Sequence, residues 1–258
     1  DDSDPVWSPD GNHIAFVSNR TEDPDGNSDS NIWVVDATKK DTDQKLIQVT
    51  TNPNQDDSPA WSPDGKQITY RTVTDGTVLW YATQHLAVSP AMGGTAKVLT
   101  ENLDRNISKP KFSVDGKSIY FMLEESGTSV LASISPSGKN LKRIIKGDIS
   151  IGDYNLHEEM VATLMGKADR PNNIYIFEKD NLKELTTVND ELLATIKKPS
   201  VEKISPRGHQ RRHQTFNLHT PNWLLRSRRR HHFRHVGFTT RRAAYWRPPF
   251  TRQHRLCH

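Results

Sequence analysis

Apolar residues recur at every second position in short runs along the first 188 residues. The clearest of these runs contain Ile14 and Phe16, Ile68 and Tyr70, and Ile119 and Phe121. Alternation with a period of two is typical of β-strands that bury one face. The pattern therefore predicts an all-β fold for this part of the chain.

Each run follows a similar turn sequence, VWSPDG at 6–11, AWSPDG at 60–65 and KFSVDG at 111–116. The aspartates of the three copies, Asp10, Asp64 and Asp115, are 54 and 51 residues apart. Proline pre-sets φ in such a turn, aspartate can bond the neighbouring backbone, and glycine accepts a positive φ. A strand-rich repeat of about 50 residues predicts the blades of a β-propeller.

Further strand patterns follow each copy, so that every unit holds about four strands. They lie at 32–35 and 46–49, at 78–81, 85–88 and 96–99, and at 130–134 and 141–145. A fourth unit is degenerate: Tyr154 takes the position of the aromatic residue, His157-Glu158-Glu159 replaces the turn, and strands follow at 173–177 and 182–186.

We therefore expect a partial β-propeller of about four four-stranded antiparallel blades over residues 1–188. The expected blades span about 1–50, 51–100, 101–146 and 147–188.

The charge of the chain changes sign near Ser205. Residues 1–204 contain 22 Lys and Arg against 31 Asp and Glu, a net charge of −9, whereas residues 205–258 contain 13 Arg and no Lys, Asp or Glu. The net charge of +4 is thus the sum of two unlike segments.

The segment 206–258 has two interpretations. Clustered arginines can form an arm that binds nucleic acid. The alternative is a stretch shifted in reading frame, disordered and without a core. The sequence favours the second interpretation, because a natural basic arm usually mixes Lys with Arg, and it makes nucleic acid an improbable partner.

Several short motifs resemble catalytic, peptide-binding or metal-binding sites. Gly127-Thr128-Ser129-Val130-Leu131 lacks the second glycine of a nucleophile elbow, and Gly93-Gly94 is expected to be a turn. Glu158-Glu159 could clamp a peptide amino terminus, but a solvated turn is favoured. The oxygen ligands at alternate positions of 23–31 resemble a calcium loop, yet its sixth and twelfth positions hold Ser28 and Val34 rather than Gly and Glu.

The remaining candidates lie in the tail. His231-His232-Phe233-Arg234-His235 resembles a metal-binding tract without carboxylates, and Cys257 has no cysteine to pair with. The sequence predicts no catalytic, cofactor-binding or metal-ligating residue. It contains no apolar run of 18 residues, so no membrane span is expected, and a cysteine-free stretch 1–204 suits either cytoplasm or periplasm.

The blades resemble those of TolB-type and prolyl oligopeptidase-type propellers. The segments RPNNIYIF at 170–177, KELT at 183–186, NDELLA at 189–194 and PSVEKIS at 199–205 are similar to the propeller exit of acylaminoacyl-peptidase-like members of the prolyl oligopeptidase family. The resemblance covers about residues 1–205 and implies that 189–205 is a linker toward an α/β-hydrolase domain.

In that family the propeller filters oligopeptides that approach a Ser-Asp-His hydrolase. No residue of this chain matches the triad motifs, so the resemblance implies a truncated, inactive fragment that lacks the hydrolase domain and amino-terminal blades. Bare blade faces would then make the fragment prone to self-association. The alternative is a TolB-like propeller that binds proteins of the bacterial envelope.

Overall fold

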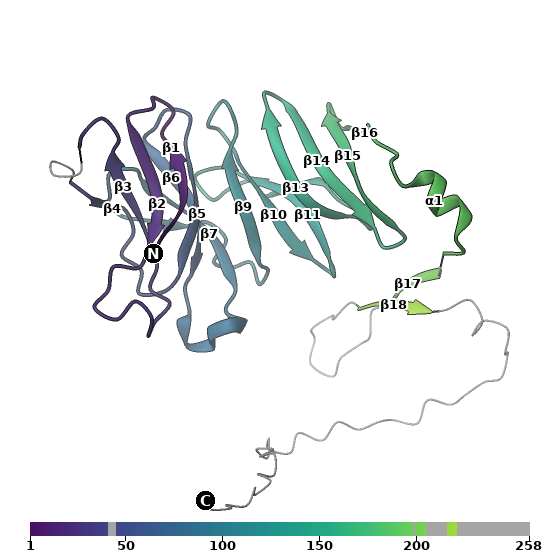
Figure 1. Cartoon of the computed structure of the whole chain (residues 1–258), viewed down its shortest axis with the longest axis horizontal. Coiled ribbons are helices and arrows are strands. Elements are labelled where there is room, and N and C mark those ends of the chain that lie inside the picture. Colours follow the sequence, from purple (N-terminus) through teal and green to yellow (C-terminus); the bar gives the residue numbers. More distant parts are fainter. Residues whose placement is uncertain (41–44, 199, 205–215, 221–258) are drawn as a thin grey trace, which may run out of the picture. The chain divides into compact units, whose positions relative to one another are not determined.

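The computed structural model describes residues 1–40, 45–198, 200–204 and 216–220, and its strands follow one another in chain order (Figure 1). The fold is an all-β propeller type, as the alternating pattern predicts. Blades 1 and 2 comprise β1 (Asp2–Trp7), β2 (His13–Ser18), β3 (Asn31–Asp36), β4 (Ile47–Gln48), β5 (Asp56–Trp61), β6 (Gln67–Val73), β7 (Gln84–Pro90) and β8 (Lys97–Val98).

Blades 3 and 4 comprise β9 (Ile107–Phe112), β10 (Ile119–Glu125), β11 (Thr128–Ile134), β12 (Lys142–Ile145), β13 (Ser150–His157), β14 (Met160–Lys167), β15 (Arg170–Glu178) and β16 (Asn181–Glu184). A short helix α1 (Asp190–Thr195) follows, and then β17 (Ser200–Ile204) pairs antiparallel with β18 (Phe216–Thr220). Apart from β18, the tail 206–258 with its histidine tract and Cys257 lies outside the described residues.

Blades 1 and 2 are separate four-stranded sheets, whereas blades 3 and 4 share one eight-stranded sheet. The junction is a single parallel bridge between Ser129 of β11 and Ser150 of β13. Because β12 pairs only with Leu131–Ser133, the start of β11 is left open and the first residue of β13 occupies it.

The turn between the first two strands of a blade has the same hydrogen bonds in all three copies. The serine hydroxyl donates to the aspartate Oδ1 at 2.6 Å (Ser8), 2.6 Å (Ser62) and 2.7 Å (Ser113). The serine hydroxyl oxygen also accepts the backbone N–H of the residue five positions after the serine, and the glycines have φ near +70°. The predicted turn chemistry is confirmed, including the copy in which Val114 replaces proline.

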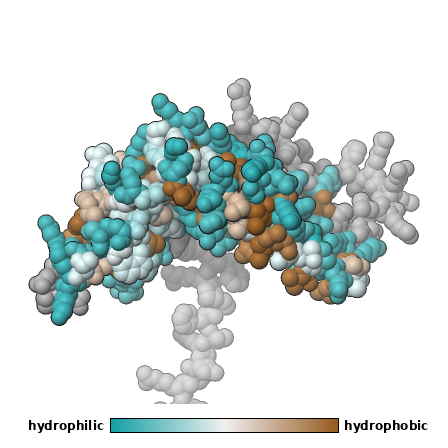
Figure 2. Space-filling view, turned by 90° about the horizontal axis from the view of Figure 1, so that it is seen from above, coloured by the Kyte–Doolittle hydropathy of each residue, from teal (hydrophilic) through white to brown (hydrophobic). Residues whose placement is uncertain are grey.

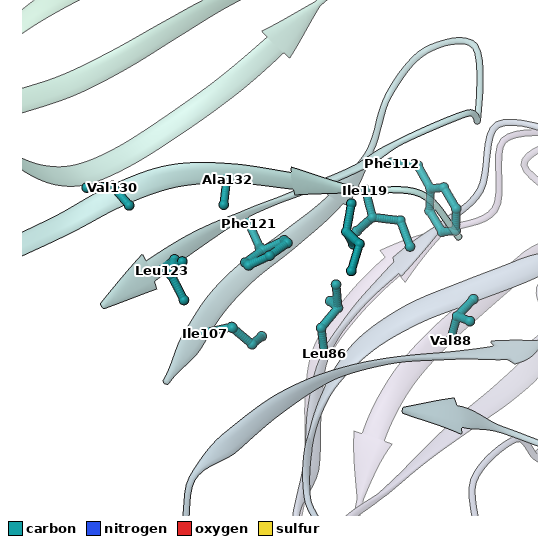
Figure 3. Packing of buried hydrophobic residues seen from close by; sticks show 10 residues of the cluster. Leu86, Val88, Ile107, Phe112, Ile119, Phe121, Leu123, Val130 and Ala132 are labelled. Carbon is teal, nitrogen blue, oxygen red and sulfur yellow. The ribbon is translucent and has the colours of Figure 1, made fainter. Parts of the chain in front are cut away.

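Each hydrophobic core lies in a seam between two neighbouring blades. In the seam between blades 2 and 3, Ile119 and Phe121 of β10 point toward Leu86 of β7 (Figure 3), and all three side chains are fully buried. Similar clusters fill the seams between blades 1 and 2 and between blades 3 and 4. The stacking of blades, rather than any single sheet, therefore removes the apolar surface from water.

Two local predictions are wrong. The sequence predicts a strand at 78–81. These residues instead belong to a 3-10 helix, η2 (Gly76–Tyr81), which lies in the connection between β6 and β7. Asp75 explains the difference, because its Oδ1 accepts the N–H of Thr77 at 3.0 Å and also the hydroxyl of that residue, which caps a helical turn.

The second wrong prediction places Tyr154 at the position of Trp7, Trp61 and Phe112. Those three residues end their strands and pair with Ile14, Ile68 and Ile119. Tyr154 lies three residues before the end of β13 and pairs with Thr163. The degenerate unit has a two-residue turn in place of the longer motif, so alignment on the turn misplaces the aromatic residue.

Candidate functional site

The first strands of the blades form a shared surface, which we call the inner-strand surface: β1, β5, β9 and β13. β5 contacts both β1 and β9, although no ladder joins these strands. In a propeller the first strand of each blade lines the central channel. This surface is therefore where a molecule passing through the propeller would meet side chains.

A bulge interrupts each of the first three inner strands at the same place. Asp4, Ser58 and Lys109 have φ of 49°, 54° and 51°, and each precedes a proline. The pairing with the second strand shifts at these points. Proline has no N–H to offer a ladder and fits the unpaired position of a bulge. The bulge thus repeats in register and sets the direction of the neighbouring side chains.

An ion pair links the inner strand β5 to the next two strands of blade 2. Arg71 Nε and Nη2 donate to the two carboxylate oxygens of Asp57, each at 2.6 Å, and Nη1 donates to Gln84 Oε1 at 2.8 Å. Gln55 also donates to Asp57, at 3.0 Å. The two-point contact fixes the orientation of the guanidinium as well as its position.

A second polar group connects blades 3 and 4, which we call the lysine clasp: Lys109, Lys111, Asp153 and Tyr154. Lys109 Nζ is 2.9 Å from Asp153 Oδ1, and Lys111 Nζ donates to the Tyr154 carbonyl at 3.0 Å. In return the Tyr154 hydroxyl donates to the Lys109 carbonyl at 2.6 Å. The clasp joins β9 to β13, which share no backbone ladder.

Two groups of the lysine clasp have pKa values that are shifted in opposite directions, one by a neighbouring charge and one by burial. The ammonium of Lys109 lowers the pKa of Asp153, so this carboxylate stays ionised. Burial raises the pKa of Tyr154, which keeps its hydroxyl protonated as a donor. A groove of about 380 Å³ opens beside these residues and is bounded by Ala162, Leu164 and Ile174.

Asp56 lies next to this surface, in the seam between blades 1 and 2, and is fully buried. Its Oδ1 accepts from Asn52 at 3.0 Å, whereas its Oδ2 has no hydrogen-bond partner among the residues that the structure describes. Burial raises the pKa of this carboxyl group, with the neighbouring Asp57 adding to the shift. Its backbone is paired with Ser30, since the Asp56 N–H donates to the Ser30 carbonyl at 2.8 Å.

The short motifs that resemble sites in the sequence do not include any residue of the ion pair or the lysine clasp. Glu158 and Glu159 are exposed in the two-residue turn between β13 and β14, and Gly93-Gly94 is in the connection between β7 and β8. Ser129 is an internal residue of β11 and Gly127 precedes that strand in a turn.

The loop of alternating oxygen ligands bonds to itself. Asn27 Oδ1 accepts from Asn19 at 2.8 Å and from the Asp29 N–H at 2.9 Å, while Asn31 donates to Asp29. The side-chain oxygens therefore organise the loop rather than converge on a common centre. In the described part of the chain, no three His, Cys, Asp or Glu side chains are grouped for a metal ion.

The described residues hold no serine or threonine whose hydroxyl is hydrogen-bonded to a histidine ring. The ring of His85, for example, is buried and its Nδ1 lies 3.0 Å from the Thr100 carbonyl. Within the same residues, no helix combines the length and apolarity needed to cross a bilayer.

Sequence reasoning did not find the ion pair of Arg71 or the lysine clasp. Lys109 and Asp153 are 44 positions apart, and only the stacking of blades brings them together. A usable signal was present, however: proline occurs two residues before Trp7, Trp61 and Phe112. That recurrence marks the bulge that places Lys109.

Comparison with known proteins agrees with this architecture. Residues 1–150 match the family of the TolB beta propeller domain. The chain is 28% identical over 117 residues to "Uncharacterized peptidase YuxL" of Bacillus subtilis, covering 45% of this chain and 16% of that protein. It is 22% identical over 204 residues to "Dipeptidyl-peptidase 5" of Porphyromonas gingivalis, covering 76% of this chain and 29% of that protein.

Among solved structures, the acylaminoacyl peptidase of Pyrococcus horikoshii matches with a TM-score of 0.62 and 16% identity, over 83% of this chain and 31% of that one. The chain thus spans less than a third of the length of these relatives. The matched residues 1–150 are more than half of the chain, so the chain belongs to the TolB beta-propeller domain family.

Proposed function

We propose that this chain is the propeller of a peptidase-family protein and that its inner-strand surface admits oligopeptides toward a catalytic domain. The similarity to Dipeptidyl-peptidase 5 carries the proposal, because it extends over 204 residues and therefore beyond the matched family region 1–150. The segment 189–205 is then the linker toward the hydrolase domain.

The inner-strand surface suits this role chemically. An extended peptide offers backbone donors and acceptors and two terminal charges, and the exposed ion pair of Lys109 and Asp153 carries both signs of charge on this surface. Contacts with such fixed polar groups are weak and reversible when exposed to water. A filter needs contacts of that kind, since a peptide must enter and also leave.

Anisotropy of dye-labelled acidic oligopeptides tests the proposal. We expect weak, salt-sensitive binding to the purified chain, reduced in Lys109→Ala and unchanged in Lys117→Ala. Lys117 is a suitable control because its side chain is 82% exposed in the turn between β9 and β10. Equal binding by the two variants would contradict a role for the inner-strand surface.

We also infer that the chain alone does not hydrolyse peptides, since a nucleophile, a base and an orienting group must be held together for that chemistry. Acyl-peptide and dipeptide chromogenic substrates should give background rates. Turnover that a serine-directed phosphonate abolishes would show that this inference is wrong.

A second candidate function is a TolB-like protein-binding module, which the family match over residues 1–150 favours. It predicts no binding of labelled oligopeptides at any salt concentration. The same anisotropy experiment therefore separates the two candidates.

A further inference from the structure

We propose that the folded chain modifies itself covalently at Asp25-Gly26, where the aspartate isomerises to isoaspartate through a succinimide ring. The site lies in the loop that connects β2 to β3. The reaction needs only water and groups of the chain itself. It does not depend on the proposed peptide-filtering function.

An aspartate that precedes a glycine can close such a ring, because glycine has no side chain to obstruct the approach of its nitrogen. The Gly26 nitrogen forms a bond to Asp25 Cγ, and the hydroxyl of the protonated carboxyl group leaves as water with the amide proton. Water then opens the ring. When it breaks the bond between the main-chain carbonyl carbon of Asp25 and the Gly26 nitrogen, the chain continues through the Asp25 side chain. No oxidant or reductant takes part.

Neither sequence nor exposure to water distinguishes this site from similar ones. The sequence contains further aspartate-glycine pairs at 10–11, 64–65, 75–76 and 115–116. The aspartates of all five pairs are exposed. Hydrophilic residues also cover most of the face of the molecule shown in Figure 2. The pairs differ instead in the contacts of the carboxyl group and of the glycine nitrogen.

The repeated turn holds three of these aspartates in place. Asp10 Oδ1 accepts the Ser8 hydroxyl at 2.6 Å and the Asn12 N–H at 3.0 Å. Asp64 and Asp115 accept the same two kinds of bond. In each copy the glycine N–H donates to the serine carbonyl at 2.9 to 3.0 Å. These bonds hold the carboxyl group away from the nitrogen that would attack it.

Asp75 is held by the helical turn that follows it. Its Oδ1 accepts the Thr77 hydroxyl at 2.5 Å and the Thr77 N–H at 3.0 Å. The hydrogen bonds lower the pKa of all four bound aspartates, that of Asp10 to about 2. Because ring closure expels water from a protonated carboxyl group, a lowered pKa leaves less of the reactive form.

Asp25 has none of these restraints. In the described part of the chain it makes no hydrogen bond and no ion pair. The Gly26 N–H is shared between Asp23 Oδ1 at 3.1 Å and the Asp23 carbonyl at 3.2 Å, and both distances exceed those of the turn glycines. The Asp25 carboxyl group can therefore rotate toward the nitrogen, as ring closure requires.

The modification would change a loop that contacts blade 2. Isoaspartate adds one carbon to the main chain between positions 25 and 26. Asn27 Nδ2 donates to the Asp23 carbonyl across this position at 2.5 Å, and further along the loop Ser30 Oγ donates to the Asp56 carbonyl of β5 at 3.1 Å. An added carbon therefore alters the spacing on which both bonds depend.

Incubation of the whole chain at about pH 5, followed by peptide mapping with electron-transfer dissociation, tests the proposal. In the folded chain we expect at least about tenfold more isoaspartate at Asp25 than at Asp10, because the lowered pKa of Asp10 removes most of its protonated form. The matched control is the same chain unfolded in urea. There the contacts of the folded state are lost, so the five pairs should react at similar rates.

Asp25→Glu tests the chemistry of the site. Glutamate would have to close a larger ring, so isomerisation at this position should fall to background. Gly26 is left unchanged, because a β-carbon there would lie 2.1 Å from Asp23 Oδ2.

Ser62→Ala tests the protection by the turn. It removes the hydroxyl bond to Asp64, so Asp64 should isomerise faster in the folded variant while Asp10 keeps its slow rate. Circular dichroism would establish that the variant is folded, and Ser113→Ala, which releases Asp115, would replace it if it is not.

Isoaspartate that forms at another aspartate-glycine pair as fast as at Asp25 in the folded wild type would overturn the proposal. So would a folded chain in which Asp25 stays unmodified while the chain in urea reacts. An excess at Asp25 that persists unchanged in urea would also overturn it, since the cause would then lie in the local sequence and not in the fold.

Discussion

At the residue scale, the serine and aspartate of the repeated turn do more than favour a bend. Ser62 is buried and donates to Asp64 while accepting the N–H of Gln67 at 2.9 Å. The hydroxyl also lowers the pKa of Asp64, as Ser8 does for Asp10, whose pKa falls from an ordinary 3.8 to about 2. One side chain therefore links the two strands that the turn joins.

Ser62→Ala should destabilise the fold by about 1–2 kcal/mol, because the buried N–H of Gln67 loses its acceptor. Urea unfolding measures the loss. Ser28→Ala is the matched control, since Ser28 is exposed in a loop. An equal loss in the two variants would contradict this account.

The turn aspartates have lowered pKa values, so their contribution to the free energy of unfolding is complete above the unfolded pKa. That contribution is lost as pH falls from about 4 toward 2.

Asp56 should respond to pH in the opposite direction. Its pKa is raised by burial, so the unfolded chain releases this proton at a lower pH than the folded chain, and stability falls as pH rises through that interval. Asp56→Asn keeps an acceptor for Asn52 and removes the charge. We expect the variant to gain stability relative to wild type as pH rises above the ordinary pKa of an aspartate, about 4. If the difference in melting temperature between Asp56→Asn and wild type does not change with pH, the pKa of Asp56 is not raised in the folded chain.

At the scale of elements, the alternating pattern and the repeated turn predict most strands, whereas contacts between blades are not visible in them. The strand predicted at 78–81 fails because Asp75 caps a helical turn that composition alone does not reveal. Tyr154 is misplaced because its unit lacks the turn used for alignment. The lysine clasp depends on the stacking of β9 beside β13, which a pattern local to one strand cannot specify.

The short helix α1 is held to blade 4 by surface ion pairs rather than by buried side chains. It has six residues and none of them is buried, so it is too short to be stable by itself. Arg170 of β15 pairs with Asp190 in its first turn and with Glu184 of β16 at 3.3 Å. Arg170 thus attaches the segment after the propeller to blade 4.

Arg170→Ala should increase amide hydrogen exchange in α1 by about tenfold or more, because the helix loses the pair that holds it. The Leu193 N–H, which donates to the Asn189 carbonyl at 2.9 Å, is the most direct reporter. Lys179→Ala is the control, as Lys179 is 79% exposed and pairs with the adjacent Glu178 rather than with α1. Unchanged exchange in α1 would mean that other contacts hold the segment.

At the scale of the whole molecule, stability resides in the seams between blades. Each core cluster joins two neighbouring blades, so a blade depends on its neighbours as the units of a repeat protein do. Substitutions at the same register position should therefore cost different amounts of unfolding free energy, depending on whether a neighbouring blade covers that face. Ile119 and Ile14 are such a pair, since each pairs with the aromatic residue that ends the first strand.

Ile119→Ala should cost about 2–5 kcal/mol in urea unfolding, because it leaves a cavity in a closed seam. Ile14→Ala should cost about 1 kcal/mol at low protein concentration, since its face is partly in water. Equal costs at the two positions would show that the face of blade 1 that carries Ile14 is already covered, and that the first blade is stabilised by contacts other than those of a seam.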